Sequence, residues 1–452
     1  MVKEVAALRD RNVLVLGLAK SGFAAAKALL RVGARVTVND AASLENDEHA
    51  TILKKQGAVI VDGGHPEEIV EGPFDLIVKN PGIPYSNPVL KRAQQKGVPI
   101  WTEVELAYLI SEAPMIGITG SNGKTTTTTL LYHLLNIDHK QPLLAGNIGT
   151  VATDVAMKAT EQNVLVTELS SFQLMGVETF RPKVAILLNV YDAHLDYHGT
   201  KEAYIEAKAN VTRYQTEDDY IIYNAEQEEV VEAVAFSKAK KVPFTRLGRT
   251  EEGISSDDDY IYWYGEKVMD RSRIQLPGDH NLQNILAATA AALLLDCSEE
   301  TLDDVLSSFT GVKHRMQFVK ECNRVKYYND SKATNTLATK SALLSFDDSL
   351  ILIAGGLERN HTFEPLRPYM DRVKAVVAIG ETKERFATFA KSCDVEHVVV
   401  ADSMMEAVER AEQLSEAGDV ILLSPACASW DQYASFELRG DTFIEAVASV
   451  TK

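Results

Sequence analysis

Short apolar runs rich in β-branched residues alternate with helix-length segments along almost the whole chain. This alternation is typical of repeated strand–helix–strand units, which build parallel sheets covered by helices. The runs fall into three sets, with breaks near Pro114 and Lys313. We therefore expect an α/β protein with three domains, at residues 1–112, 113–312 and 313–452. The predicted strands are Val13–Leu16, Arg35–Asn39, Ala58–Val61, Asp75–Val78 and Val98–Trp101 in the first set, Met115–Thr119, Val164–Glu168, Val184–Asn189 and Tyr220–Tyr223 in the second, with hairpin material at Gly253–Ile274, and Val325–Tyr328, Leu350–Ala354, Ala375–Ile379, Val398–Val400 and Val420–Leu423 in the third.

The charge and cysteine content exclude several classes of protein. Lys and Arg number 46 and Asp and Glu 64, so the formal net charge of the 452 residues is −18. Non-specific binding to nucleic acid or to an anionic membrane needs a basic face, so we expect neither. The four cysteines show no CxxC spacing, which argues against a zinc site. No run reaches the ~20 apolar residues of a membrane helix, and no apolar signal segment precedes the first turn, so we expect a cytoplasmic protein.

A first glycine turn, Gly17–Gly22, joins the first predicted strand to a helix. Free N–H groups and the helix dipole make such a turn an anion site. Asp40 ends the second strand, where an acid of a Rossmann-like domain meets a ribose hydroxyl. Alanine at position 19 breaks the dinucleotide fingerprint, so a single nucleoside diphosphate is more plausible than NAD, and a purely structural turn is an equal alternative. The turn Asn80–Pro84 ends another strand and is expected to line the same crevice.

A second glycine loop, Gly117–Thr125, lies between a buried strand and a long helix that starts at Lys124. A triphosphate needs small residues whose N–H groups wrap it, a lysine for its outer oxygens and a hydroxyl for Mg²⁺. Gly123, Lys124 and Thr125 supply these groups, although the spacing departs from the strict P-loop because position 118 is isoleucine. The loop predicts a P-loop-type ATP-binding domain with a mainly parallel sheet.

Two strand ends after this loop carry candidate metal ligands. Glu168 ends a core strand where a Mg²⁺-binding acid is expected, and an ordinary strand-end carboxylate is the alternative. His194 follows the next strand, and a lone histidine is more often structural.

Lys208 lies in a predicted helix, on one face with Tyr204 and Val211. A lysine among apolar neighbours either packs its stem and keeps its tip wet, or is buried with a lowered pKa. A neutral amine adds CO₂ and becomes a carbamate, which is a carboxylate-like metal ligand. From the helix alone, the packing role is favoured.

In their order along the chain, these segments resemble the Mur ligase family, the ATP-dependent amino-acid ligases of peptidoglycan synthesis. The resemblance covers nearly the whole chain and includes a C-terminal Rossmann-like α/β domain. It is carried by Gly120–Thr125, Glu168–Gln173, His194, Lys208, His280–Asn284, His314-Arg315, Asn329–Asn335 and Ser424–Asp431. The last two segments are most similar to the members that add D-glutamate.

The resemblance implies a reaction: ATP phosphorylates the carboxylate of UDP-N-acetylmuramoyl-L-alanine, and the amine of D-glutamate displaces the phosphate. It implies ATP and two Mg²⁺ ions as cofactors, a carbamylated Lys208 and a monomeric chain. Catalytic roles fall on Lys124, His194 and Lys208. The implied ATP-binding residues are Gly120, Ser121, Asn122, Gly123, Lys124, Thr125, Thr126, Asn281, Asn284, Arg315, Asp330 and Lys332. The implied metal ligands are Thr125, Glu168, His194 and Lys208. The implied substrate-binding residues are Ala19, Lys20, Ser21, Asp40, Asn80, Gly82, Asn147, Gln173, Thr334, Arg359, Ser429 and Phe436.

The family form has lysine in place of Arg359, and the two cations differ in the geometry with which they bind a carboxylate. Other hypotheses are a related ligase with a different acceptor or one that extends folate with glutamate, a nicotinamide dehydrogenase, and a nucleotide-controlled switch. The missing glycine at position 19 argues against the dehydrogenase, and the third-domain segments favour D-glutamate over other amino acids.

Overall fold

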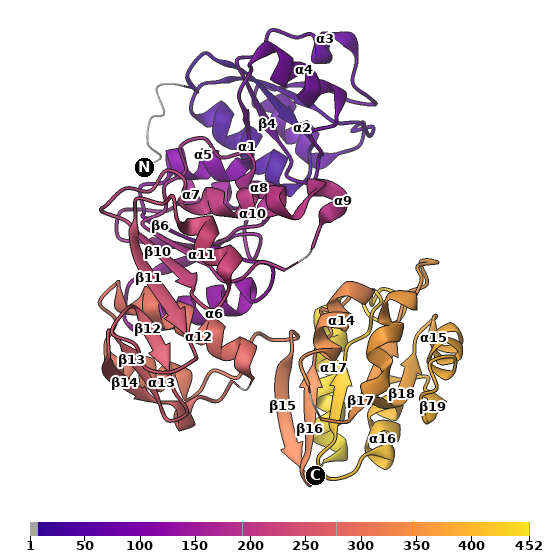
Figure 1. The fold of residues 1–452 in the computed structure, drawn as a ribbon. Coiled ribbons are helices and arrows are strands. Elements are labelled where there is room, and N and C mark those ends of the chain that lie inside the picture. Colours follow the sequence, from indigo (N-terminus) through magenta and orange to yellow (C-terminus); the bar gives the residue numbers. More distant parts are fainter. Residues whose placement is uncertain (1–7, 192, 277, 347, 452) are drawn as a thin grey trace. The chain divides into compact units, whose positions relative to one another are not determined.

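The computed structural model describes residues 8–191, 193–276, 278–346 and 348–451, which form three sheets covered by helices (Figure 1). Residues 1–308 make one compact unit with two sheets, and residues 309–452 make a second unit with the third sheet. The predicted α/β class with mainly parallel sheets is confirmed. The domain ends near 112 and 312 stay a prediction.

The first sheet is fully parallel, with the order β3-β2-β1-β4-β5. This order is one half of a Rossmann-like fold, in which the crevice at the carboxyl ends of the strands lies beside the first strand. Its strands are β1 (Asn12–Leu16), β2 (Arg35–Asn39), β3 (Val59–Val61), β4 (Leu76–Lys79) and β5 (Ile100–Trp101), and its helices are α1 (Lys20–Arg31), α2 (Glu48–Lys55), α3 (Glu67–Val70), α4 (Pro88–Lys96) and α5 (Glu103–Ile110).

The second sheet has nine strands in the order β14-β13-β12-β11-β10-β9-β6-β8-β7, antiparallel only where the β12–β13–β14 hairpins pair. Its strands are β6 (Met115–Thr119), β7 (Pro142–Gly146), β8 (Val164–Glu168), β9 (Val184–Leu187), β10 (Tyr220–Asn224), β11 (Lys240–Thr245), β12 (Ile254–Ser256), β13 (Tyr260–Trp263) and β14 (Glu266–Asp270). Its helices are α6 (Lys124–Ile137), α7 (Ala152–Ala156), α8 (Ser171–Leu174), α9 (Leu195–His198), α10 (Lys201–Ala209), α11 (Glu228–Val234), α12 (Asp279–Leu293) and α13 (Glu299–Leu306).

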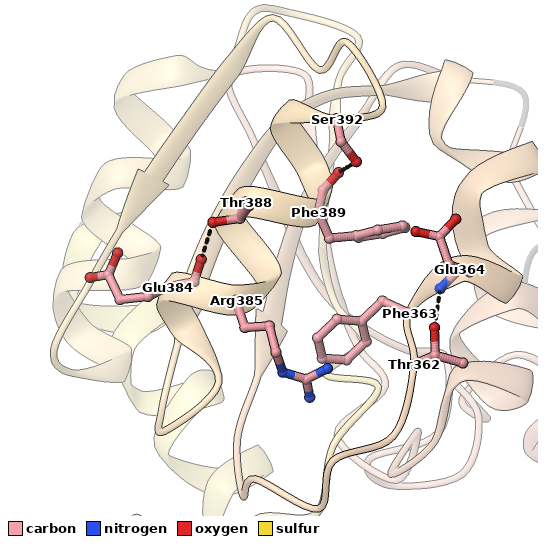
Figure 2. A pocket seen from close by; sticks show the side chains of 8 residues that line it. All are labelled: Thr362, Phe363, Glu364, Glu384, Arg385, Thr388, Phe389 and Ser392. Carbon is pink, nitrogen blue, oxygen red and sulfur yellow. Dashed lines mark hydrogen bonds between the residues drawn. The ribbon is translucent and has the colours of Figure 1, made fainter.

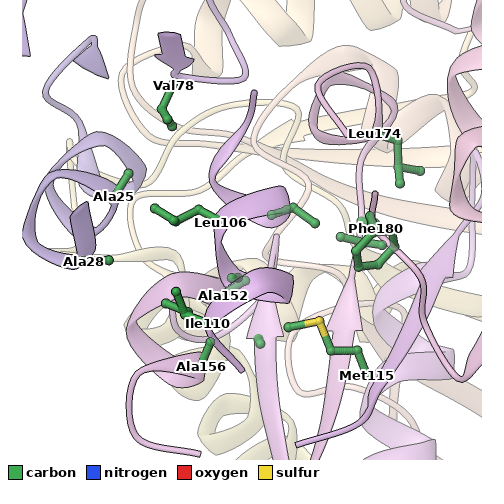
Figure 3. Packing of buried hydrophobic residues seen from close by; sticks show 14 of the residues in the cluster. Ala25, Ala28, Val78, Leu106, Ile110, Met115, Ala152, Ala156, Leu174 and Phe180 are labelled. Carbon is green, nitrogen blue, oxygen red and sulfur yellow. The ribbon is translucent and has the colours of Figure 1, made fainter. Parts of the chain in front are cut away.

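One apolar core runs through both sheets of the first unit, because α5 packs on helices from each (Figure 3). Leu106 and Ile110 of α5 are fully buried beside Ala25 of α1 and Ala152 of α7. Glu103, at the start of α5, accepts the Thr153 N–H at 3.0 Å. A shared core and a buried polar anchor hold the two sheets together, so the carboxyl ends of their strands keep a fixed relation.

The third sheet has the order β15-β16-β20-β17-β18-β19 and is parallel except for its edge strand β15. Its strands are β15 (Gln317–Cys322), β16 (Val325–Asn329), β17 (Leu350–Gly355), β18 (Val373–Ile379), β19 (His397–Val400) and β20 (Val420–Leu423), and its helices are α14 (Thr336–Leu343), α15 (Lys383–Lys391), α16 (Met404–Leu414) and α17 (Phe436–Val450). No helix within the described residues is long and apolar enough to cross a membrane.

Candidate active site

The glycine loop after β6 is closely packed by a neighbouring helix. Gly123 has a φ of 82°, and a Cβ at this position would lie 2.0 Å from Oδ1 of Asn284 on α12. Asn284 in turn donates to Oδ1 of Asn281, one helical turn away, at 3.4 Å. The structure therefore places Asn284 against the loop, with Asn281 bonded to it. Only glycine fits at position 123, where Asn284 approaches the backbone.

Asn189, which follows β9, clamps this loop from the other side. Its backbone carbonyl accepts the Ser121 N–H at 2.9 Å, and its side-chain Oδ1 accepts the Asn122 N–H at 2.8 Å. Its side-chain amide donates to the Asn122 carbonyl at 3.2 Å. Asn189 was not among the predicted site residues, although its place at the end of a buried strand was a usable signal.

Two lysine side chains meet at one carbonyl oxygen of the loop. Lys124 Nζ donates to the carbonyls of Gly120 and Ser121, both at 2.8 Å, and Lys208 Nζ donates to the same Gly120 carbonyl at 2.8 Å. Lys208 is only 1% exposed, so the alternative of a packed stem with a wet tip is wrong. Burial, and next the charge of Lys124, lower the pKa of Lys208 well below its ordinary value, against the opposing charge of Glu168.

Glu168 ends β8 as a buried carboxylate with one free oxygen. Its Oε1 accepts from the side chain of Asn147 at 2.8 Å, whereas its buried Oε2 has no hydrogen-bond partner. An unpaired buried carboxylate oxygen is unfavourable unless a ligand satisfies it. Thr125, buried in the first turn of α6, offers a hydroxyl of the kind that binds Mg²⁺. The described residues gather no cluster of three or more His, Cys, Asp or Glu side chains, so other oxygens would have to complete a metal site here.

His194 lies in an aromatic cluster near the loop. Its ring centre is 5.0 Å from that of Phe172 and 6.3 Å from that of Tyr204, and its φ is 55°. The Tyr204 hydroxyl is hydrogen-bonded to the Ser121 hydroxyl at 3.0 Å. His194 is exposed, so its ring is accessible to a ligand.

The turns at the carboxyl ends of β1, β2 and β4 carry the residues predicted for the UDP group. The φ of Gly17 is 91°, and a Cβ on Gly22 would lie 1.9 Å from the Gly17 carbonyl, so both glycines are required by the turn. Asp40 accepts the Leu18 N–H at 2.7 Å and therefore fixes the turn. Asn80 accepts the N–H of Gly82 at 3.1 Å. Ala19, Lys20 and Ser21 form the junction of the turn with α1.

Lys79, which was not among the predicted site residues, organises the Asn80–Pro84 turn. Its side chain is 1% exposed and donates to the carbonyls of Pro81 at 3.0 Å and Ile83 at 2.9 Å. Burial lowers the pKa of Lys79 to about 8. The Tyr197 hydroxyl of α9 donates to the same two carbonyls at 3.2 and 3.1 Å, so the turn is tied to the second sheet.

Gln173 lies at the junction of the first two sheets. Its Oε1 accepts the Ser170 N–H at 2.9 Å, and its Nε2 donates to Glu103 at 3.4 Å. Both polar ends of Gln173 are therefore engaged within the protein. Asn147, predicted with Gln173 for the sugar–peptide part, donates to Glu168 Oε1 at 2.8 Å.

In the second unit, Asp330 is a buried carboxylate at the end of β16. It accepts from the Ser424 hydroxyl at 2.9 Å and from the Met316 N–H at 3.2 Å. Burial raises the pKa of Asp330 from 3.8 to about 7. Lys332 Nζ lies 5.8 Å from the centre of the Phe436 ring, while Arg315 follows the buried His314.

Arg439 of α17, also not selected from the sequence, joins two of the segments that carried the family resemblance. The guanidinium donates to the Ser331 hydroxyl at 3.0 Å, to the Ser331 carbonyl at 2.8 Å and to the Cys427 carbonyl at 3.1 Å. Its side chain is 1% exposed. Thr334 lies close after Ser331, and the buried Ser429 close after Cys427, so Arg439 fixes the segments that carry both.

The Asp330 carboxyl predicts a pH dependence of stability. Because its pKa is higher in the folded than in the unfolded chain, the folded state loses stability as the pH rises from about 4 to about 7, by up to about 1.4 kcal/mol per pH unit. Asp330→Asn has no such loss. Thermal unfolding of the ligand-free protein should therefore give a Tm difference, variant minus wild type, that is larger at pH 8 than at pH 5. Each kcal/mol of stability lost by wild type corresponds to about 2–4 °C of this difference.

Asp348→Asn serves as the control, because Asp348 is a half-exposed acid paired with Lys326. Its difference from wild type should be the same at both pH values. If the Tm difference for Asp330→Asn were also the same at pH 5 and pH 8, Asp330 would not have a raised pKa in the folded protein.

Three family models match consecutive parts of the chain. The "Mur ligase MurD-like, N-terminal domain" matches residues 11–102, the "Mur ligase middle domain" residues 118–292 and the "Mur ligase, glutamate ligase domain" residues 314–427. A curated protein of Geobacillus sp. (strain WCH70), called UDP-N-acetylmuramoylalanine--D-glutamate ligase, is 55% identical over 99% of each chain. The chain belongs to the Mur ligase family. A protein of the same name from Bacillus cereus (strain B4264) is 52% identical, again over 99% of each chain.

Solved structures of other Mur ligases share the fold. MurF ligase from Thermotoga maritima, in complex with ADP, aligns with a TM-score of 0.56 over 100% of this chain and 97% of its own, at 17% identity. UDP-N-acetylmuramate-alanine ligase MurC from the same organism aligns with a TM-score of 0.54 over 97% and 99%, at 18% identity. At these identities the likeness concerns the fold alone.

Proposed function

We propose that this protein joins D-glutamate to UDP-N-acetylmuramoyl-L-alanine in a reaction that converts ATP to ADP and phosphate. The observation that carries the proposal is the likeness, at 52–55% identity over 99% of the chain, to Mur ligases named for this reaction. The glycine loop supports the proposal, because Lys124 at its end and the buried Lys208 of α10 both donate to its Gly120 carbonyl.

A carboxylate and an amine do not condense unaided in water, so the acid must first be activated. A carboxylate oxygen of the muramoyl substrate attacks the γ-phosphorus of ATP, which gives an acyl phosphate and ADP. The amine of D-glutamate then adds to the acyl carbon, and the tetrahedral intermediate expels phosphate and loses a proton to leave the amide. Lys124 and the loop N–H groups around Gly123 would hold the phosphates, since positive charge and N–H donors stabilise the transferred group.

The residues present fit Mg²⁺, because Glu168 Oε2 is a buried carboxylate oxygen without a partner and Thr125 offers a hydroxyl in the first turn of α6, directly after the glycine loop. These two residues would hold one ion, and His194 with Lys208 the region of a second. When bound, Mg²⁺ would screen the gathered phosphate and carboxylate charges.

Lys208 fits the role of a carbamate. The lowered pKa favours the neutral amine, which would attack CO₂ and lose a proton, so that a neutral group becomes an anion with two oxygen ligands. The charge of Lys124 favours this change twice, because it disfavours the protonated form of Lys208 and attracts the carbamate anion.

The remaining contacts follow the predicted assignment. The UDP group would bind Ala19, Lys20, Ser21, Asp40, Asn80 and Gly82, with Asn147 and Gln173 toward the peptide. ATP would also bind Ser121, Asn122, Thr126, Asn281, Asn284, Arg315, Asp330 and Lys332, and D-glutamate would bind Thr334, Arg359, Ser429 and Phe436. We infer a monomeric protein that acts in the cytoplasm, with domain ends near residues 112 and 312.

The test is ADP release from ATP with UDP-N-acetylmuramoyl-L-alanine, measured with D-glutamate and with L-glutamate, glycine, L-lysine or no amino acid. We expect turnover only with D-glutamate and equimolar formation of phosphate and the ligated product. Turnover that prefers another amino acid would indicate a related ligase, and ADP release that ignores amino acids would indicate a nucleotide switch.

A further inference from the structure

Arg359 and Trp430 form a cation–π pair on the surface of the second unit. The guanidinium carbon lies 5.0 Å from the centre of the indole ring, and Trp430 is 65% exposed. Within the part of the chain that the structure describes, the guanidinium of Arg359 has no hydrogen bond or ion pair. The indole of Trp430 is too exposed to serve in the core, and the Arg359 guanidinium that packs on it has N–H groups without a partner among the described residues.

The loops that carry these two residues are bonded to each other. The Leu357 N–H donates to the Ala428 carbonyl at 2.9 Å, two residues before Arg359 and Trp430 respectively. Gly356 has a φ of 150°, and a Cβ there would lie 2.4 Å from the same carbonyl. The spacing between the two side chains is therefore set by backbone contacts.

A second strand end anchors both loops. The Thr382 hydroxyl accepts the Gly356 N–H at 3.0 Å, and the Asp431 carboxylate accepts the Glu381 N–H at 3.0 Å. Glu381 and Thr382 follow β18, so both loops are bonded to the segment at the carboxyl end of that strand. The backbone on which Arg359 and Trp430 lie is therefore held by hydrogen bonds from several sides.

Glu358, the acidic residue next to Arg359, already pairs with a different arginine. Glu358 forms a two-point ion pair with Arg385, at 2.8 and 2.9 Å, and Arg385 lies 4.3 Å from the centre of the Phe363 ring. Arg385 and Phe363 line a pocket of about 480 Å³ beside α15 (Figure 2). Glu358 is therefore not available to Arg359, whose charge is left for a ligand.

We propose that Trp430 is a positioning residue that determines how tightly D-glutamate binds, because it holds Arg359 ready for one of the substrate's carboxylates. An aromatic face supports the flat guanidinium and leaves the N–H groups at its edge free for a two-point bond to a carboxylate. The buried Ser429 precedes Trp430 and brings a hydroxyl to the same loop. This inference rests on the proposed function, since it names how that amino acid is bound.

Trp430→Ala tests the inference by steady-state kinetics. We expect the KM for D-glutamate to rise about tenfold, within the range for a cation–π contact, while kcat and the KM values for ATP and the UDP substrate change less than about twofold. Trp430→Phe, which keeps an aromatic face, should recover most of the loss. In an Arg359→Ala background, Trp430→Ala should add almost nothing, because the two residues act as a unit.

Tyr260→Ala is the matched control, because Tyr260 also forms a cation–π pair. Lys267 Nζ lies 3.8 Å from its ring centre, in a hairpin of the first unit. Its kinetics should match wild type. An unchanged KM for D-glutamate in Trp430→Ala, or additive effects of the two substitutions, would overturn the inference while wild type still uses D-glutamate. Failure of wild type to use D-glutamate would instead overturn the proposed function.

Discussion

Lys208→Ala is expected to reduce kcat by at least about 10²–10³-fold, the range for removing one group that stabilises transition-state charge. The side chain is buried, touches the Gly120 carbonyl and has a pKa lowered well below its ordinary value, so it is placed to become a carbamate rather than a surface cation. Small carboxylates such as acetate should restore part of the activity of this variant by occupying the vacated space.

Two measurements separate this role from packing. Lys208→Met fills the space, so we expect it to retain thermal stability, to be as inactive as Lys208→Ala and not to respond to acetate. Wild type incubated with ¹³CO₂ should give a carbamate carbon signal by NMR that both variants lack. Lys201→Ala is the control on the same helix, because Lys201 is half-exposed and pairs with Glu229. Full activity of Lys208→Met would reduce Lys208 to a packing residue.

Lys124→Met is expected to lower kcat by about 10²–10³-fold, with a smaller effect on the KM for ATP. Lys124 Nζ donates to the Gly120 and Ser121 carbonyls, at the start of the helix where the phosphates would bind. Its interaction with the transferred phosphoryl group strengthens as charge develops, so the transition state loses more than the ground state does. Initial rates over a range of ATP concentrations measure both constants.

Lys140→Met, beyond the other end of the same helix, is the control, because Lys140 pairs only weakly with Asp138 at 3.5 Å. A second result is expected for Lys124→Met. Because the charge of Lys124 lowers the pKa of Lys208, its removal should shift the appearance of the ¹³C carbamate signal to higher pH. A kcat within threefold of wild type would exclude Lys124 from the chemistry.

Most of the sheet strands were predictable from sequence, because parallel strands buried on both faces are continuous apolar runs. The strands that were missed depart from this rule. β7 and β15 are edge strands, and β7 contains a proline and a glycine. β11 contains two lysines and Pro243 and pairs with β12 over only two residues.

The candidate site was predicted unevenly, and the reason is physical. Lys124, Thr125 and Glu168 follow buried strands, so the chain itself brings them to one sheet edge. Asn189 ends a predicted strand, but its contacts with Ser121 and Asn122 could not be predicted, because they form only when β6 and β9 pair side by side. Lys79 was hidden because its side chain satisfies carbonyls in a turn whose path only the folded chain defines.

The sequence by itself determined the α/β class, the glycine loop with its helix, and the chemistry available at the strand ends, since these depend on local residue pattern. Tertiary structure decided whether Lys208 was wet or buried, because exposure depends on the packing around its helix. Tertiary structure also set Arg359 on Trp430 and joined the first two sheets through α5. Each of these contacts links residues far apart in the chain, and such contacts form only when the strands and helices have packed.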